Sequence, residues 1–210
     1  MGYVVAFLSQ KGGVGKSTLA RALACEASKG GLSVKVADLD TQQGTVTNWH
    51  RQREANGFDR IGSVETFGKA KEALKSADNF DMLILDGAPR ASSATNDIAK
   101  VADLIILPSG ASRDDLMPTV LLAHELSKKG VPSNLFAIAL VRVATESEIR
   151  DAQEYIRMSG YQLLKGYLPE KPSYRQAQND GLAVTETRYA SINEKAKELI
   201  QSIIDVLTND

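Results

Sequence analysis

The sequence has very little cysteine and histidine, almost no net charge and no long apolar run. Cys25 is the sole cysteine among 210 residues, which excludes an intrachain disulfide and a zinc site built from several thiolates. The 25 Lys and Arg residues nearly balance the 26 Asp and Glu residues, so the chain does not coat nucleic acid through bulk positive charge. No window approaches the roughly 20 apolar residues that a membrane-spanning helix needs. With no signal-peptide pattern at the start, we expect a soluble cytoplasmic protein.

The sequence does contain a regular alternation of short apolar runs and helical patterns. The runs predict strands at 3–8, 34–37, 82–85, 104–107, 135–141 and 162–168. Apolar residues at three- and four-residue spacing predict helices at 17–29, 47–55, 69–76, 115–129, 146–158 and 192–207. Because strand and helix alternate, we expect a single α/β domain over residues 1–210, with a mostly parallel twisted sheet and helices on both faces.

The loop after the first predicted strand, residues 10–18, has the composition of a phosphate-binding loop. Glycines let a backbone wrap closely around phosphates, and the following helix adds its positive end. Lys16 supplies a cation for the β and γ phosphates, the Ser17 hydroxyl suits Mg²⁺, and Thr18 can donate to the α phosphate. The alternative, a turn that merely caps a helix, leaves the lysine–serine pair unexplained. The predicted nucleotide-binding residues of the loop are Gly12, Gly13, Val14, Gly15, Lys16, Ser17 and Thr18.

Read as KGGVGKST, the same loop resembles the deviant Walker A motif of the ParA/MinD family of P-loop ATPases. In that family the early lysine, here Lys11, reaches across a dimer interface to the partner's nucleotide. A second cation over the transferred phosphoryl group stabilises the charge that develops in the transition state, as an arginine finger does. The resemblance therefore implies a homodimer in the ATP state, with Lys11 and Lys16 as catalytic residues. The alternative for Lys11 is a solvated loop lysine.

Two aspartates close the second predicted strand. Asp38 and Asp40 resemble the start of the family's D-x-D-P-Q-G segment, with Thr41 in place of the proline. By this resemblance Asp40 positions the attacking water and is the third catalytic candidate, while Asp38 supports the magnesium shell. Two aspartates that cap a turn are the alternative.

A third aspartate follows the apolar run 82–85, as in a Walker B strand. Asp86 needs a charged partner if it is buried there, and Mg²⁺ held by Ser17 would be that partner. Residues 87–90 resemble the family's switch loop, in which the N–H of Gly87 would meet the γ phosphate. The resemblance therefore implies ATP and Mg²⁺ as cofactors, with Ser17, Asp38 and Asp86 around the metal.

The resemblance extends over most of the chain, from Val4 to about Leu207. At the strand end occupied by Arg142 the family places a residue against adenine; a surface salt bridge is equally compatible with an arginine. Similar proteins wrap adenine with backbone groups in the segment that begins around Pro169. Residues 176–186 also resemble a segment of the family, and Asp115 and Leu116 fit its interface segment.

ParA-type members bind nonspecific DNA as ATP dimers, which requires basic residues on one face. The candidates are Arg175, Arg188, Lys195 and Lys197; ordinary solvated charges are the alternative. Residues 187–210 contain three basic and four acidic residues, unlike the basic amphipathic tail that brings MinD-type proteins to membranes. We therefore expect no membrane partner. Trp49 and His50 are interpreted as helix packing and a solvated edge.

Together these patterns indicate a small ParA-type partition ATPase without an N-terminal DNA-binding domain. It would hydrolyse ATP slowly, segregate DNA or position cargo on the nucleoid, and answer to a ParB-like or other adaptor protein. A membrane-associated MinD-like regulator and a metabolic P-loop ligase or kinase remain alternatives. Iron–sulfur reductase relatives need two cluster cysteines per subunit, and a non-enzymatic DNA-binding module leaves the glycine-rich loop unexplained.

Overall fold

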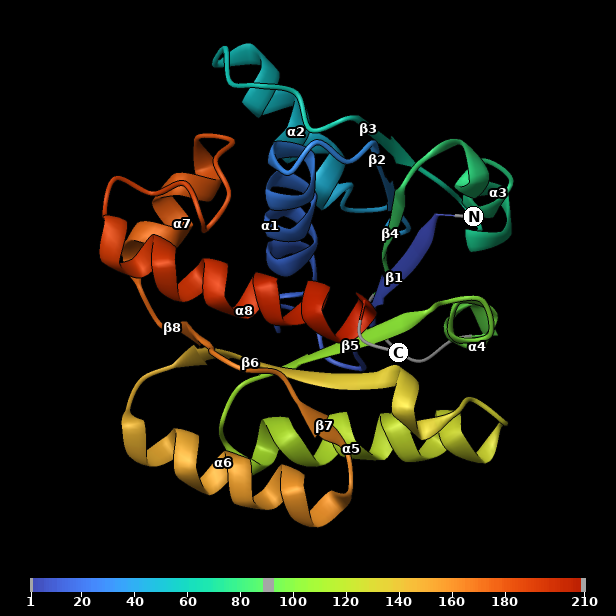
Figure 1. Cartoon of the computed structure of the whole chain (residues 1–210), viewed down its shortest axis with the longest axis vertical. Coiled ribbons are helices and arrows are strands. Elements are labelled where there is room, and N and C mark those ends of the chain that lie inside the picture. Colours follow the sequence, from blue (N-terminus) through green and yellow to red (C-terminus); the bar gives the residue numbers. More distant parts are fainter. Residues whose placement is uncertain (1, 89–92, 209–210) are drawn as a thin grey trace.

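The computed structural model describes residues 2–88 and 93–208. In this part of the chain eight strands form one sheet, and every paired strand is parallel to its neighbour (Figure 1). The order across the sheet is β3-β2-β4-β1-β5-β6-β7, and β8 also pairs with β6. The strands are β1 Tyr3–Phe7, β2 Val34–Asp38, β3 Ser63–Thr66, β4 Met82–Asp86, β5 Leu104–Ser109, β6 Phe136–Val143, β7 Gln162–Leu163 and β8 Leu168–Pro169.

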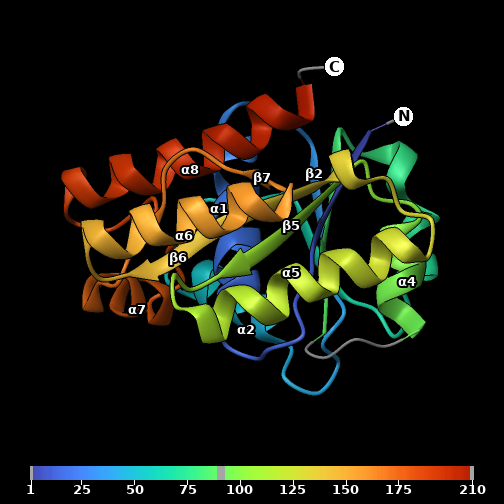
Figure 2. The ribbon, with the colours of Figure 1, turned by 90° about the horizontal axis from the view of Figure 1, so that it is seen from below.

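Helices cover both faces of this sheet. Figure 1 shows α1 and α8 on one side of β5 and β6 with α5 and α6 on the other, and Figure 2 looks onto the α5–α6 side. The α-helices of the described chain are α1 Lys16–Lys29, α2 Thr45–Ala55, α3 Ala70–Leu74, α4 Ser93–Ala99, α5 Arg113–Lys128, α6 Glu146–Ser159, α7 Pro172–Asn179 and α8 Ala190–Thr208. The predicted layered α/β architecture is therefore confirmed.

The strand sequences are apolar throughout because both faces of the sheet are buried. Val5 and Phe7 of β1 pack into the core beneath α1 and α8, whereas Val4 and Ala6 pack into the core on the α5–α6 side. A one-residue shift of this strand would exchange the two sets, so both cores specify its register. β1 lies between β4 and β5, with β2 beyond β4, which brings the loops after β1, β2 and β4 together at one edge of the sheet.

Several predicted elements differ from the structure. The strand predicted at 162–168 is wrong as a single element: it is two short strands, β7 and β8, separated by Gly166 at φ 75°. A Cβ at Gly166 would lie 3.1 Å from the Leu199 amide nitrogen, so the chain passes close to α8 here instead of continuing along the sheet. The helix predicted at 69–76 is shorter, at Ala70–Leu74.

Three elements had no prediction at all. β3 is a four-residue edge strand with half-exposed side chains, so it lacks an apolar run. α4 and α7 have seven and eight residues, which is too short for a clear helical period. Of these, α7 matters most for function because it borders the pocket described below.

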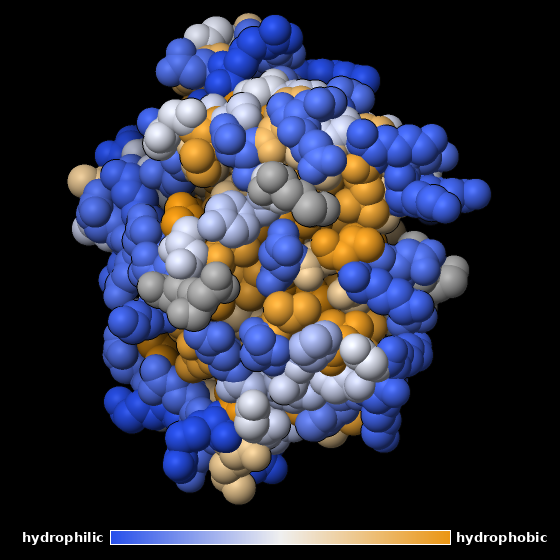
Figure 3. Space-filling view, turned by 45° about the vertical axis from the view of Figure 1, so that its right-hand side comes forward, coloured by the Kyte–Doolittle hydropathy of each residue, from blue (hydrophilic) through white to orange (hydrophobic). Residues whose placement is uncertain are grey.

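Some apolar side chains remain on the surface. Figure 3 shows the side of the molecule that carries α3 and α4, and apolar side chains gather at its centre among hydrophilic ones. The exposed apolar residues Tyr3, Leu32 and Val101 each begin or shortly precede a strand, so they lie at the edge of the sheet opposite the loops that form the site. Among the described residues no helix combines the length and apolarity needed to cross a membrane.

Candidate functional site

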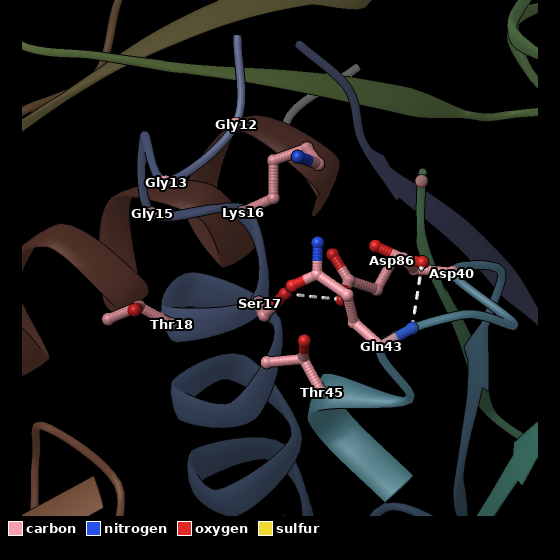
Figure 4. A pocket seen from close by; sticks show the side chains of 11 residues that line it. Gly12, Gly13, Gly15, Lys16, Ser17, Thr18, Asp40, Gln43, Thr45 and Asp86 are labelled. Atoms are coloured by element: carbon pink, nitrogen blue, oxygen red, sulfur yellow. Dashed lines mark hydrogen bonds between the residues drawn. The ribbon is translucent and has the colours of Figure 1, made fainter. Parts of the chain in front are cut away.

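A pocket of about 190 Å³ opens at the carboxyl ends of β1, β2 and β4 (Figure 4). The loop after β1 wraps one side of it, and the loops after β2 and β4 close the other. Its lining residues are Gly12, Gly13, Gly15, Lys16, Ser17, Thr18, Asp40, Gln43, Thr45, Asp86 and Gly87. All but one of the predicted loop residues therefore face the same space. The exception, Val14, is buried and does not line the pocket.

The loop after β1 presents backbone groups to this pocket. Gly15 has φ 96°, a conformation that favours glycine, and a Cβ there would lie 3.3 Å from Val141 Cγ2. Gly15 is also the N-cap of α1 and offers no side-chain hydrogen bond to the first turn. The first N–H groups of α1 thus stay available to an anion at the positive end of the helix.

Lys16 brings a buried positive charge to the pocket. The residue is 7% exposed, and within the described chain its ammonium group has no hydrogen bond or ion pair. Burial lowers the pKa of Lys16, although the carboxylates of Asp86 and Asp40 act in the opposite direction. A buried cation of this kind requires an anionic partner, and a phosphate in the pocket would provide one.

Asp86 brings a carboxylate that is only half satisfied. It is 1% exposed, and its Oδ2 accepts a hydrogen bond from Ser17 Oγ at 2.6 Å. Its Oδ1 is buried with no hydrogen-bond partner among the described residues. Burial raises the pKa of Asp86 to about 7, and the nearby Asp38 carboxylate adds to the shift. The orphaned oxygen and the adjacent hydroxyl are oxygen ligands that fit a divalent cation.

The donor set suits Mg²⁺ better than a metal held by protein alone. In the described chain no group of three or more His, Cys, Asp or Glu side chains could hold a metal ion. Mg²⁺ in phosphate sites usually takes one or two protein oxygens and completes its shell with water and phosphate oxygens. Ser17 and Asp86 supply such a pair, next to the loop that would hold the phosphates.

The two aspartates after β2 occupy different environments. Asp40 lines the pocket, and its Oδ1 accepts a hydrogen bond from the Gln43 amide at 3.1 Å (Figure 4). Asp38 is fully buried beneath the pocket and does not line it. Its Oδ2 accepts from the Val46 and Thr47 amides at 2.9 and 3.1 Å, which caps the start of α2. Asp38 Oδ1 accepts from the Asp40 amide at 3.2 Å, so this side chain positions the Asp40 loop.

The loop after β4 begins at Gly87, which packs against β1. A Cβ there would lie 2.8 Å from both the Phe7 carbonyl oxygen and Leu8 Cδ2, so only glycine fits. Its N–H donates to the Phe7 carbonyl at 3.0 Å instead of pointing to a phosphate position, which differs from the expected role in this conformation. Pro89 and Arg90 of the predicted switch loop lie outside the described residues.

Lys11 lies outside the pocket and is held by its own chain. Its ammonium group donates to the Asp114 carbonyl and lies 3.0 Å from Asp115 Oδ1, at the start of α5. Ser112 Oγ donates to Asp115 Oδ2 at 2.9 Å and fixes the carboxylate. Burial acts to raise the pKa of Asp115, yet the hydrogen bonds from Lys11 and Ser112 bring it below its ordinary value. Lys11 is therefore neither a freely solvated lysine nor a ligand of the pocket in its own chain.

A second pocket of about 270 Å³ adjoins the first and shares Gly13, Gly15 and Thr18 with it. Arg142 and Pro169, the predicted base-binding residues, both line it. Arg142 has φ 55° at an irregularity between β6 and β8, and no other non-glycine residue of the described chain has positive φ. The remaining lining residues are Val141, Leu168, Glu170, Lys171, Tyr174, Arg175, Gln178 and Val184.

The segment after Pro169 was expected near adenine, but neither the helix α7 nor the contacts of Gln178 were predicted. Gln178 Oε1 accepts from Thr18 Oγ1 and from Arg21 Nη1, each at 3.1 Å. Arg21 is buried, donates to the Thr45 carbonyl at 2.6 Å and lies over the Trp49 ring at 5.3 Å. These contacts connect the loop, α2 and α7. Pro172, at the first helical position of α7, is the one sequence signal for this helix.

The four basic residues considered for DNA contacts are engaged within the chain. Arg175 pairs with Glu170 at 2.8 Å and Lys197 with Glu194 at 3.0 Å. Lys195 donates to the Tyr167 hydroxyl at 2.9 Å. The remaining candidate, Arg188, lies 4.8 Å from the centre of its neighbouring tyrosine ring. The structure thus gives these residues local partners of their own.

Comparisons with known proteins show which family the chain belongs to. Over 193 residues the chain is 28% identical to the maintenance of carboxysome distribution protein A of Gloeobacter kilaueensis, covering 91% of this chain and 88% of that protein. A Cyanothece McdA variant in complex with ATP superposes with a TM-score of 0.74 at 15% identity, covering 96% of each chain. MinD of Pyrococcus horikoshii in complex with Mg-ADP gives 0.76 at 14% identity, covering 99% of this chain and 98% of that one. The profile of the CobQ/CobB/MinD/ParA nucleotide-binding domain matches residues 5–184, and the chain belongs to this family.

Proposed function

We propose that this protein is a Mg²⁺-dependent ATPase that dimerises around ATP and uses its hydrolysis to position a large cargo. The observation that carries the proposal is that one pocket contains two buried charged side chains that lack hydrogen-bond or ion-pair partners, in whole or in part, among the described residues. Lys16 is a buried cation without a hydrogen bond or ion pair, and Asp86 is a buried carboxylate with one oxygen unpartnered, within the described chain. A phosphate chain would give Lys16 an anionic partner, and the Mg²⁺ bound to that chain would give Asp86 a cationic one.

The residues of the pocket divide the chemistry between them. Gly12, Gly13 and Gly15 leave room for the phosphates beside the uncapped first turn of α1. Ser17 and Asp86 would hold the Mg²⁺, which neutralises charge on the β and γ oxygens when bound. Asp40 faces the same space and is the residue proposed to orient the attacking water. Asp38 positions the loop that carries Asp40, so its role is proposed to be indirect.

Lys11 supports the dimeric part of the proposal. It precedes the glycines of the loop but does not line its own pocket. Its ammonium group is held at the surface by Asp115, in a partly exposed ion pair. We infer that this cation leaves Asp115 in the ATP dimer and approaches the partner's nucleotide. Charge stabilisation at the transferred phosphoryl group would then require a second copy of the chain.

The second pocket is proposed to hold the nucleoside. Val141, Leu168 and Tyr174 give it apolar walls, and Pro169 and Arg142 line it as well. A pocket with apolar walls and a few polar groups suits a purine base. Thr18 lines both pockets, so one ligand could extend from the base site to the phosphate site.

The proposal for the cargo rests on the Gloeobacter protein whose sequence is similar to this chain. The Gloeobacter protein is named for the maintenance of carboxysome distribution, and similarity extends over most of both chains. We propose an analogous role in the positioning or segregation of a large cargo or DNA, with nonspecific DNA as the track and an adaptor protein that stimulates hydrolysis. The four basic candidates have local partners within the chain. DNA binding would therefore require these side chains to leave those partners, or would use other basic residues.

Size-exclusion chromatography with light scattering tests the proposal directly. The full chain should be a monomer with ADP and a dimer with a non-hydrolysable ATP analogue and Mg²⁺. Addition of unrelated duplex DNA should shift only the dimer to larger mass. A protein that remains a monomer with saturating analogue would contradict the dimeric mechanism, and ATP turnover that depends on a small carboxylate would favour a metabolic enzyme.

A further inference from the structure

A groove of about 530 Å³ lies between the start of α5 and the exposed side of α6, apart from both nucleotide pockets. Figures 1 and 2 both show these helices side by side on the same face of the sheet. The groove is lined by Ala111, Ser112, Arg113, Leu116, Glu148, Asp151, Glu154, Tyr155 and Met158. None of these residues lines either nucleotide pocket.

Apolar groups form the floor of the groove and part of its α6 side. Leu116 is buried at the base, and Tyr155 is partly exposed beside it. Met158 is 78% exposed at the C-terminal end of α6, the highest value among the large exposed apolar side chains of the described chain. An exposed methionine is a flexible apolar contact that adapts to a partner's side chains.

The α6 side of the groove also carries acidic residues. Glu148, Asp151 and Glu154 follow one another at three-residue spacing along α6, which spans about 9 Å. Glu148 is occupied because its Oε2 accepts the Ala144 and Thr145 amides at 2.9 and 3.3 Å, closing the capping box of α6. Within the described chain Asp151 and Glu154 make no side-chain hydrogen bond or ion pair.

Charge in the groove is strongly unbalanced. Of the described residues that line it, one is basic, Arg113, and three carry carboxylates. Two of those carboxylates lack partners, so they attract cations more strongly than the paired acidic residues elsewhere on the surface. An apolar floor bordered by unpaired carboxylates is complementary to a segment with apolar and basic residues on adjacent faces.

We propose that the α5–α6 groove docks a basic amphipathic segment of a partner protein. Lysine or arginine side chains of that segment face Asp151 and Glu154, and its apolar side chains contact Tyr155 and Met158. A helix with basic residues three or four positions apart matches the spacing of the carboxylates on α6. The bound segment lies along α6 and ends near Ser112.

The position of the groove connects docking to the nucleotide site. Ser112 lines the groove and also donates to Asp115, which holds Lys11. A segment that contacts Ser112 would alter the hydrogen bond that fixes this carboxylate, and thereby the release of Lys11. This consequence rests on the proposed dimeric ATPase, whereas docking itself does not.

Peptide binding to the nucleotide-free full chain tests the docking surface. The probe is a fluorescent amphipathic peptide of about 15 residues with arginines on one face and leucines on the other, and its counterpart has glutamates in place of the arginines. The test variant is Asp151→Lys with Glu154→Lys. The matched control is Glu72→Lys with Asp78→Lys, an exposed acidic pair outside the groove that gives the same change in net charge.

We expect the groove variant to bind the arginine peptide about 10-fold more weakly than the unsubstituted protein, and to gain affinity for the glutamate peptide. The control should change affinity by less than about 2-fold. Met158→Gln leaves the net charge unchanged and removes the exposed apolar contact, so it should also weaken arginine-peptide binding. Equal weakening by the groove and control variants would show attraction to overall charge only and overturn the proposal.

Two further measurements distinguish a partner segment from a second copy of the chain in the groove, and separate the docking proposal from the proposed ATPase function. A groove variant that keeps peptide affinity but no longer dimerises with the ATP analogue would mean that a second copy covers the groove. ATP affinity is measured on the same variants, because both substituted side chains lie outside the nucleotide pockets. An unsubstituted chain that does not hydrolyse ATP would contradict the proposed function, whereas the result of the peptide-binding experiment would still apply to the groove.

Discussion

Release of Lys11 from its own chain should limit dimer formation, and Asp115→Asn tests this. The substitution keeps the size of the side chain but removes its charge, so Lys11 loses an ion pair at 3.0 Å and keeps its hydrogen bond to the Asp114 carbonyl. If the proposed dimer needs Lys11 free, weaker retention in the monomer favours the dimer. We therefore expect Asp115→Asn to dimerise at a lower protein concentration.

The size of the effect follows from the exposure of the pair. The Lys11 and Asp115 side chains are 41% and 25% exposed, so solvent screens much of their attraction. Such a pair contributes about 0.5–1 kcal/mol, and each dimer releases two of them, one per protomer. The dimer should gain about 1–2 kcal/mol, which lowers its dissociation constant by about 5- to 30-fold.

Sedimentation velocity with the non-hydrolysable ATP analogue measures this constant over a range of protein concentrations. Asp114→Asn is a matched control, because Lys11 contacts only the backbone carbonyl of Asp114 and the substitution removes the same charge one residue away. The affinity of the monomer for the nucleotide should stay the same in both variants. If Asp115→Asn dimerises less readily than the unsubstituted chain, Asp115 serves the dimer and the reasoning is wrong.

Three further predictions concern the pocket and the fold. Lys16→Ala should lose nucleotide binding in isothermal titration calorimetry, because it removes the buried cation of the pocket; ordinary ATP affinity in this variant would refute the phosphate site. Asp40→Ala should bind ATP and dimerise but release phosphate at least about 100-fold more slowly, and an unchanged rate would exclude it as the water-orienting group. Glu186 pairs with Arg53 at 2.7 Å. Burial acts to raise the pKa of Glu186, but its hydrogen bonds, that from Arg53 above all, lower the pKa to about 2. The ionised side chain therefore stabilises the fold above pH 4.5, its ordinary pKa, and this stabilisation is lost as the pH falls toward 2. In urea unfolding Glu186→Gln should therefore be about 2 kcal/mol less stable at pH 7 and nearly equal to the unsubstituted chain near pH 2, whereas Glu170→Gln, in an exposed pair, should change little; a deficit that does not vary with pH would contradict the charge-based explanation.

Most of the loop residues that line the first pocket could be predicted from the sequence because they are consecutive. Residues 10–18 sit between a strand and a helix, and local rules alone direct glycines and Lys16 toward one space. Asp40 and Asp86 could be added because parallel strands end at the same edge of a sheet. Neither inference needed a long-range contact that is specific to this chain.

Contacts between distant segments could not be predicted in this way. Gln178 contacts Thr18 across 160 positions, and α7 has only eight residues, so no local pattern beyond Pro172 predicts this helix. The burial of Asp38 beneath the pocket depends on how α2 starts, which sequence spacing leaves open. Lys11 likewise has a partner 104 positions away that only the packing of α5 reveals.

Lys16 and Lys11 are therefore proposed to act in different steps, Lys16 in nucleotide binding by one chain and Lys11 in dimerisation. Lys16 and Asp86 are both buried and incompletely paired within the described chain, so ligand binding relieves a cost that the folded monomer already contains. A ligand that binds only the folded state raises its stability by RT ln(1 + [L]/Kd), and a nucleotide should therefore raise the melting temperature of the monomer. Lys11 is paired in the monomer, so its proposed transfer to a partner would exchange one ion pair for another and add little to the affinity of one chain for ATP. Lys11→Ala should consequently keep the thermal shift produced by ATP and lose the dimer, whereas Lys16→Ala should lose both. If Lys11→Ala abolished the thermal shift, the lysine would act within its own chain, and the division of roles between the two ammonium groups would be wrong.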